Sequence, residues 1–166
     1  GSKDDYVSAG WKSYSSLIFQ NDVWTTGGIQ YTITSATPAE VEFMISYDAP
    51  EDVVVPATAT DPYFNLTYSV VAISRTIGNE NTKTITLPNT IKEIPDYTFI
   101  NFTSLTTVNI PASVTTIGTQ AFSDCEALTT VNVEGANPAE LGSYVFDKYI
   151  YDEDFYYYRP LENVRI

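Results

Sequence analysis

The sequence predicts a mainly β fold, a β-rich α/β solenoid of short stacked units behind an N-terminal β-hairpin cap. Three observations lead to this fold class. Apolar positions recur 23 residues apart in the second half of the chain, as at Ile85, Val108 and Val131. The segments around them alternate apolar and β-branched polar residues, as strands do, and another pair of alternating segments precedes the repeats. A repeat of this length is one supersecondary unit that buries its apolar face only against its neighbours.

The first element, residues 1–28, lies outside the repeats. Gly1 and Ser2 resemble a cloning remnant, and the following KDD suits a solvated tether. The stretch YVSAGWKSYSSLIFQNDVW is strongly aromatic. We therefore expect a short arm that packs on the next element.

The second element, residues 29–52, is predicted to be an antiparallel hairpin. Ile29, Tyr31 and Ile33 alternate with polar residues, SATPAE supplies a turn, and VEFMI alternates again. The end of a solenoid exposes a sheet edge and apolar surface, which need a cover. The hairpin is expected to be that cap.

The third element, residues 53–166, is assigned to the solenoid, with inserted loops expected near 57–68 and 147–158. Its repeats are clearest over residues 82–133. VVVPATA and YSVVAIS repeat the pattern upstream, and LENVRI repeats it after the second insertion. Insertions leave the core of a solenoid as loops on one face, often the binding face.

Each unit is expected to begin with a strand such as TTVNI, in which Val108 and Ile110 face the core while Thr107 and Asn109 face solvent. Proline follows the strand, since it cannot donate to a ladder. VTTIG predicts a second short strand, and TQAFSDCEAL an irregular or helical turn. The expected core consists of Leu87, Ile94, Phe99, Leu105, Val108, Ile110, Ile117, Phe122, Leu128 and Val131.

Composition narrows the choice of partners. The chain has 8 basic and 21 acidic residues and a net charge of −13. A basic footprint is needed to bind phosphates, so nucleic acid is excluded as a partner and anionic membrane surfaces are disfavoured. No apolar run reaches the roughly 18 residues of a membrane-spanning helix, so no transmembrane segment is expected in this chain.

Reactive side chains are scarce, and we expect no catalytic residue, no cofactor and no enzyme activity. The chain contains no His, which removes the commonest general base and metal ligand. Cys125 is the single cysteine and occupies a fixed repeat position. A Cys-His pair is impossible, and a small buried thiol is the favoured interpretation.

Carboxylates gather in the second insertion at Asp152, Glu153 and Asp154. A solvated acidic loop is the favoured interpretation. A weak cation site at Asp152 and Asp154 is an alternative, because hard cations take oxygen ligands. Glycosidase chemistry is disfavoured, since it needs two carboxylates held across a cleft.

Aromatic residues crowd the same insertion, and the chain has 13 tyrosines in all. Tyrosine offers a large amphipathic contact area and is enriched at recognition surfaces. The rings are expected either to bind a partner or to cover the end of the solenoid. The partner-binding candidates are Tyr149, Tyr151, Asp152, Asp154, Phe155, Tyr156 and Tyr157.

The repeats resemble a known family. The segments LPNTIKEIPDYTFINFTSLTTVNIP and IPASVTTIGTQAFSDCEALTTVNV resemble the BspA-type (Treponema pallidum-type) leucine-rich repeat, although Thr82, Pro95 and Glu134 depart from its pattern. The positions that match its unit are Ile110, Pro111, Val114, Ile117, Gly118, Ala121, Phe122, Cys125, Leu128 and Val131.

The resemblance implies a right-handed leucine-rich-repeat solenoid from a protein exported to the surface of Bacteroidetes or their relatives, often as a lipoprotein, and involved in adhesion. The expected function is a non-catalytic interaction module with a protein or glycan ligand on another cell or matrix. One alternative is a structural or accessory domain of a larger surface protein. Another is a carbohydrate-binding module that uses Trp11, Trp24 and tyrosines, because ring faces suit apolar sugar faces.

Overall fold

A computed structural model describes residues 22–76, 78–134, 140–152 and 155–160. Within these residues the chain forms strands and turns and no helix, as the mainly β prediction requires. The last predicted rung, LENVRI, lies outside the described residues, as does the arm before residue 22. The strands are β1 (Val23–Thr26), β2 (Ile29–Ala36), β3 (Ala39–Ile45), β4 (Asp52–Val54), β5 (Thr58–Thr60), β6 (Thr67–Ile73), β7 (Thr84–Thr86), β8 (Glu93–Ile94), β9 (Thr107–Ile110), β10 (Thr116–Ile117), β11 (Thr130–Val133), β12 (Glu140–Leu141), β13 (Asp147–Asp152) and β14 (Phe155–Pro160).

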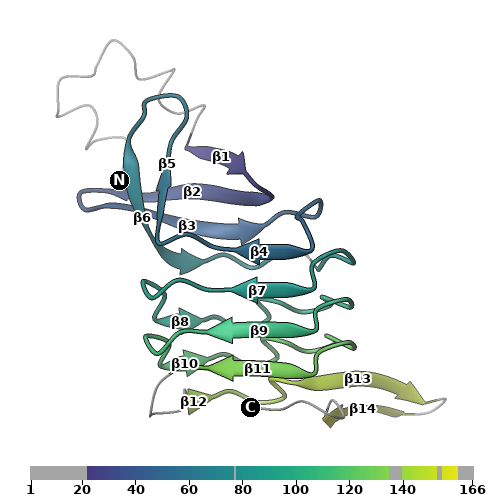
Figure 1. The fold of residues 1–166 in the computed structure, drawn as a ribbon. Coiled ribbons are helices and arrows are strands. Elements are labelled where there is room, and N and C mark those ends of the chain that lie inside the picture. The colour runs from purple at the N-terminus through teal and green to yellow at the C-terminus, as the bar shows by residue number, and fades with distance from the viewer. Residues whose placement is uncertain (1–21, 77, 135–139, 153–154, 161–166) are drawn as a thin grey trace.

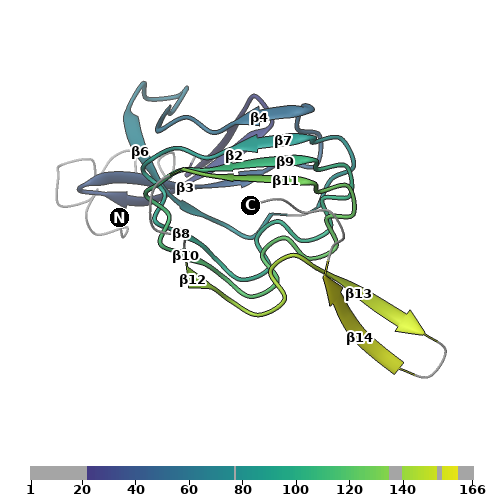
Figure 2. The ribbon, with the colours of Figure 1, turned by 60° about the horizontal axis from the view of Figure 1, so that its bottom comes forward.

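Two parallel sheets form facing sides of the solenoid (Figures 1 and 2). One has the order β11-β9-β7-β4 and the other β12-β10-β8. In the first sheet Ile85 pairs with Val108, and Val108 pairs with Val131. The 23-residue period of the sequence is therefore the register of the sheet, and the predicted repeat fold is confirmed.

Irregular turns complete each rung, and their backbones bond from rung to rung. The Phe99 amide donates to the Ala121 carbonyl at 2.8 Å, and the Phe122 amide donates to the Val145 carbonyl at 2.9 Å. Gln120 and Asp124 have left-handed backbones, with φ of 54° and 59°. TQAFSDCEAL is therefore the irregular turn, and its backbone bonds partly to neighbouring rungs and partly within the turn, as from the Ala121 amide to the Gly118 carbonyl, rather than along a helix.

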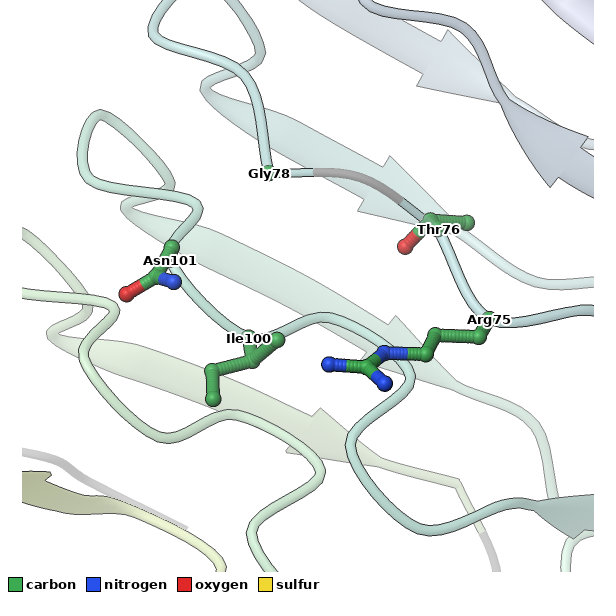
Figure 3. Close-up of a pocket in the computed structure, with 5 residues that line it drawn as sticks. All are labelled: Arg75, Thr76, Gly78, Ile100 and Asn101. Carbon is green, nitrogen blue, oxygen red and sulfur yellow. The ribbon is translucent and has the colours of Figure 1, made fainter.

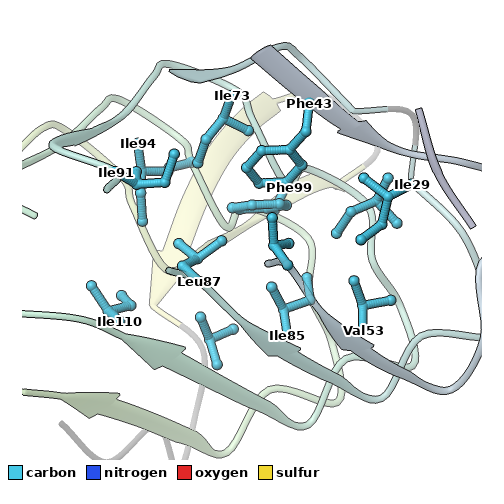
Figure 4. Close-up of a cluster of buried hydrophobic side chains, with 14 of the residues drawn as sticks. Ile29, Phe43, Val53, Ile73, Ile85, Leu87, Ile91, Ile94, Phe99 and Ile110 are labelled. Atoms are coloured by element: carbon cyan, nitrogen blue, oxygen red, sulfur yellow. The ribbon is translucent and has the colours of Figure 1, made fainter. Parts of the chain in front are cut away.

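The core runs through cap and solenoid without a break, and Phe43 of β3 and Phe99 of the solenoid belong to one cluster (Figure 4). The rings of Phe99 and Phe122 are stacked with centroids 5.2 Å apart, and those of Phe122 and Phe146 are 5.6 Å apart. All ten side chains assigned to the core from the sequence are buried: Leu87, Ile94, Phe99, Leu105, Val108, Ile110, Ile117, Phe122, Leu128 and Val131.

The cap is a five-stranded sheet of order β1-β2-β3-β6-β5. The antiparallel hairpin predicted within 29–52 is β2–β3. The segment near 57–68, expected as an inserted loop, instead contains β5 and the start of β6, and these two strands form a second hairpin. Because β6 pairs in parallel with β3, the unit containing YSVVAIS joins the cap sheet while β4 joins the solenoid sheet.

Polar contacts join the cap to the first full rung, where the repeat leucine is replaced by Thr82. Thr82 is fully buried, and its hydroxyl donates to the Pro50 carbonyl at 3.2 Å. The buried Asn79 side chain accepts from the Thr82 amide at 2.7 Å and donates to the Ser46 carbonyl at 3.3 Å. These bonds satisfy polar groups that would otherwise destabilise the junction.

Candidate functional site

The insertion predicted near 147–158 is a two-stranded antiparallel hairpin, β13–β14, rather than a loop. It extends away from the solenoid beside the last described rung (Figure 2). Within the described residues, no helix has the length and hydropathy needed to cross a membrane.

The base of this hairpin is fixed to the rung that precedes it. The Asp147 carbonyl accepts from the Ser123 hydroxyl at 2.8 Å and from the Asp124 amide at 3.0 Å. The Asp124 carboxylate accepts from the Tyr149 amide at 2.8 Å. Burial raises the pKa of the Asp147 carboxyl above its ordinary value. The hairpin therefore leaves the solenoid from a defined anchor.

Register divides the hairpin into two faces, because directly opposed residues of an antiparallel pair share a face and neighbours along a strand alternate. Tyr149 pairs with Tyr158, and Tyr151 pairs with Tyr156. These four positions, which we call the tyrosine face, lie on one side. The opposite face consists of Lys148, Ile150, Asp152, Phe155, Tyr157 and Arg159.

The partner-binding candidates from the sequence are thereby separated. Tyr149, Tyr151 and Tyr156 lie on the tyrosine face, whereas Asp152 lies on the opposite face. Tyr149 is 43% exposed. The structure does not describe Asp154. In the described part of the chain, no group of three or more His, Cys, Asp or Glu side chains is arranged to hold a metal ion. The remaining candidates are Phe155 and Tyr157, both on the opposite face.

The outward rows of the larger sheet form a polar ladder. The Asn132 carboxamide donates to the Asn109 side-chain oxygen at 2.7 Å, and the Asn109 carboxamide donates to the Thr86 hydroxyl at 2.9 Å. Thr107 and Thr130 form the neighbouring row and are half-buried. Because the amides bond to one another, this face already satisfies much of its own hydrogen-bonding capacity.

Cys125 is buried in the turn between rungs, and its thiol donates to the Phe99 carbonyl at 3.1 Å. Burial raises the pKa of the thiol to about 12. Thiolate is the reactive form of cysteine, so this environment makes Cys125 a poor nucleophile.

A shallow pocket of about 250 Å3 lies between the segment that follows β6 and the turn that follows β8. It is lined by Arg75, Thr76, Gly78, Ile100 and Asn101 (Figure 3). The Arg75 guanidinium lies 5.8 Å from the centre of the Tyr97 ring. The pocket contains no carboxylate, thiol or imidazole among these residues. It offers a cation and an amide but no group that could act as a general base.

Two aromatic features were not anticipated from the sequence. Tyr63 and Phe64 are 60% and 43% exposed at the turn between β5 and β6, where the sequence predicts an inserted loop but no aromatic surface. Trp24, a proposed sugar-stacking residue, is instead buried and stacked on Tyr31 at 5.4 Å. The sequence does not distinguish a buried tryptophan from an exposed one here, because both kinds occur in strands where apolar and polar residues alternate. Trp11 is outside the described residues.

Two solved bacterial structures illustrate the fold that this chain shares. A leucine-rich repeat protein from Bacteroides capillosus ATCC 29799 aligns with a TM-score of 0.57 at 19% identity, over 69% of this chain and 99% of that chain. The pneumococcal vaccine antigen PcpA aligns with a TM-score of 0.50 at 16% identity, over 76% of this chain and 42% of that chain. No curated protein matches the chain.

The repeats themselves match a described family. Residues 73–165 match the BspA type leucine-rich repeat region in 6 copies. The matched segment is more than half of the 166 residues, and it contains β7, β9 and β11, whose parallel registers carry the 23-residue period. The chain belongs to the BspA type leucine-rich repeat family.

Proposed function

We propose that this domain is a non-catalytic interaction module of an extracellular or cell-surface protein, and that it binds a macromolecular ligand through the β13–β14 hairpin. The observation that carries the proposal is the placement of the hairpin. It is anchored by Asp147 and Tyr149 to the turn that precedes it and extends beyond the rung (Figure 2). A cap would lie across the open end instead.

The surface location rests on the family and on its neighbours. The solved relative from pneumococcus is described as a vaccine antigen, which is consistent with exposure outside the cell. The non-catalytic role is supported by the absence of His from the sequence and by the burial of Cys125.

The test is a shortened hairpin. Residues 150–157 are replaced by Asn-Gly, which joins the paired positions Tyr149 and Tyr158 through a two-residue turn. The parent and the variant are applied to an immobilised panel of purified matrix proteins, neutral glycans and acidic glycans. We expect the parent to bind at least one member, and the variant to lose that binding with its melting temperature within about 3 °C of the parent.

Two results would contradict the proposal. The proposal is wrong if the parent binds the panel no more strongly than an inert domain of equal charge. A fall in melting temperature of about 8 °C or more would correspond to a stability loss of several kcal/mol, and would show that the hairpin stabilises the solenoid as a cap.

A further inference from the structure

The pocket beside Arg75 lies where two small residues occupy positions that hold larger residues in the next rung. Thr76 and Gly78 come 23 residues before Phe99 and Asn101. The Thr76 amide donates to a carbonyl of the next rung at 3.1 Å, as the Phe99 amide does at 2.8 Å. A Cβ on Gly78 would lie 2.4 Å from the Asn101 carbonyl oxygen, so any side chain there would displace the neighbouring turn. The smaller residues leave a hollow of about 250 Å3.

Arg75 presents its guanidinium to this hollow. Figure 3 shows the side chain reaching toward the turn that carries Ile100 and Asn101. The guanidinium lies 5.8 Å from the centre of the Tyr97 ring, and this contact restricts its position. In the part of the chain that the structure describes, no carboxylate pairs with it, and the Asp96 carboxylate instead accepts from a backbone amide of the next rung at 2.6 Å. The in-plane N–H donors of Arg75 are therefore available to a ligand.

The chemistry of the lining residues indicates what the ligand carries. A guanidinium binds a carboxylate through two parallel hydrogen bonds. The Asn101 carboxamide is exposed and forms no hydrogen bond with any residue that the structure describes, so it can both donate to a ligand and accept from it. Ile100 adds an apolar wall. A ligand that matches all three has one carboxylate, hydroxyl groups and an apolar face, and a sugar acid has this combination.

The backbone around the pocket favours a sugar over an acidic peptide. An extended peptide binds by pairing with free backbone groups at a sheet edge. The amides of Thr76 and Asn101 already donate to carbonyls of the next rung, at 3.1 and 3.0 Å. An Asp or Glu side chain carries no hydroxyl, so it would leave the Asn101 carboxamide unmatched. The net charge of −13 repels a polyanionic chain, whereas a single carboxylate needs only one cation.

We propose that this pocket binds a single sugar-acid residue of an otherwise neutral glycan, with Arg75 on its carboxylate and Asn101 on its hydroxyl groups. Tyr97 is a positioning residue that holds the Arg75 guanidinium at the pocket. The site goes beyond the proposed function, because it lies between the segments that follow β6 and β8 and shares no residue with the β13–β14 hairpin.

The probe is methyl β-D-glucuronide, compared with methyl β-D-glucoside, which has a hydroxymethyl group in place of the carboxylate. Each is titrated into the whole isotope-labelled chain at constant ionic strength, and NMR follows the Asn101 amide and Arg75 guanidinium signals. We expect saturable shifts at both residues with a Kd of about 1–10 mM, since the contact is small. The glucoside should bind at least about tenfold more weakly, because it cannot accept the paired hydrogen bonds of the guanidinium.

Variants of Arg75 assign the binding to the pocket. Arg75→Gln should weaken the glucuronide by about tenfold or more, and Arg75→Lys, which keeps the charge but not the planar fork, by about threefold or more. Lys92→Gln removes the same charge from another exposed position and should change the affinity by less than about twofold. Arg75 is itself exposed, so its variants are expected to fold, and the amide spectrum of each variant measures this directly.

Asn101→Asp tests the pocket from its other side. The added carboxylate repels the ligand and competes for Arg75, so binding should fall by about tenfold. Aspartate tolerates the left-handed backbone of Asn101, which has a φ of 63°. Asn65→Asp makes the same change at an exposed asparagine with a φ of 57° in the turn between β5 and β6, and should leave the affinity within about twofold of the parent.

Equal binding of the glucuronide and the glucoside, no shift at up to about 50 mM, or an unchanged affinity in Arg75→Gln would overturn the inference. Equal binding of N-acetyl-aspartate amide would also overturn it, by showing that the pocket recognises a carboxylate alone. The shortened hairpin should bind the glucuronide like the parent, so failure of this site is distinguishable from failure of the proposed function. A panel glycan that Arg75→Gln loses and the shortened hairpin keeps would support this site and contradict the proposed function.

Discussion

Replacing Phe122 by alanine removes the middle ring of a stack that joins three successive rungs. Phe122 is fully buried, and its ring lies 5.2 Å from Phe99 and 5.6 Å from Phe146, with interplanar angles of 21° and 14°. Truncation of a buried Phe costs about 3–5 kcal/mol through lost burial and the cavity that remains. Each lost ring contact adds about 0.5–1.5 kcal/mol, so we expect a loss near the upper end, about 4–5 kcal/mol.

The assay is equilibrium unfolding in urea, with the free energy obtained by linear extrapolation and the slope compared between variants. A domain of this kind has a total stability of about 5–15 kcal/mol, so Phe122→Ala should leave it marginally folded. Phe64→Ala makes the same chemical change at an exposed turn position and should cost less than about 1 kcal/mol. Phe122→Leu, which keeps most of the volume, should cost roughly 1–2 kcal/mol.

A loss below about 1.5 kcal/mol for Phe122→Ala, with an unchanged urea slope, would refute the reasoning. It would show that the stack does not transmit stability between rungs, or that the register of the turns differs from the one described. An equal loss at Phe64 would show that the cost reflects the unfolded chain rather than the core.

Three other predictions concern single positions. Cys125 should resist iodoacetamide in the native state at pH 8 and react only on unfolding, because burial raises its pKa from 9.0 to about 12. The raised pKa also means that the stabilisation from the protonated thiol is complete below pH 9 and is lost as pH rises toward 12, by about 1.4 kcal/mol per pH unit. Urea titrations of Cys125→Ala should lack this slope. Gly118→Ala should destabilise the fold by several kcal/mol in the same assay, since its Cβ would collide with the backbone of Pro95 and Asp96; a melting temperature equal to that of the parent would contradict this close approach. Asn109→Ala should cost about 0.5–1.5 kcal/mol by breaking two ladder bonds at once, whereas no loss would mean that the ladder exchanges freely with water.

The repeat itself is determined by the sequence alone. Ile85, Val108 and Val131 recur at a fixed interval, and a stacked parallel sheet is the arrangement in which equivalent residues of every unit bury the same face. Once that interval is set, the core positions and the outward Asn and Thr rows follow from the alternation of strand side chains. Periodicity is a local property of the chain, so reading it requires no knowledge of distant contacts.

The ends of the solenoid depend on tertiary structure, because non-repeated segments choose their partners by long-range fit. Nothing local indicates that β6 pairs with β3 rather than with the rung below it, or that Thr82 replaces a leucine by bonding to Pro50. The hairpin shows the same limit at smaller scale. In DKYIYDEDFYYYRP the alternation of Tyr149 and Tyr151 is visible, but which β14 tyrosines join them depends on the register set by the turn. A shift of one residue moves every β14 residue to the other face, so the composition of the tyrosine face was decided only by the pairing of β13 with β14.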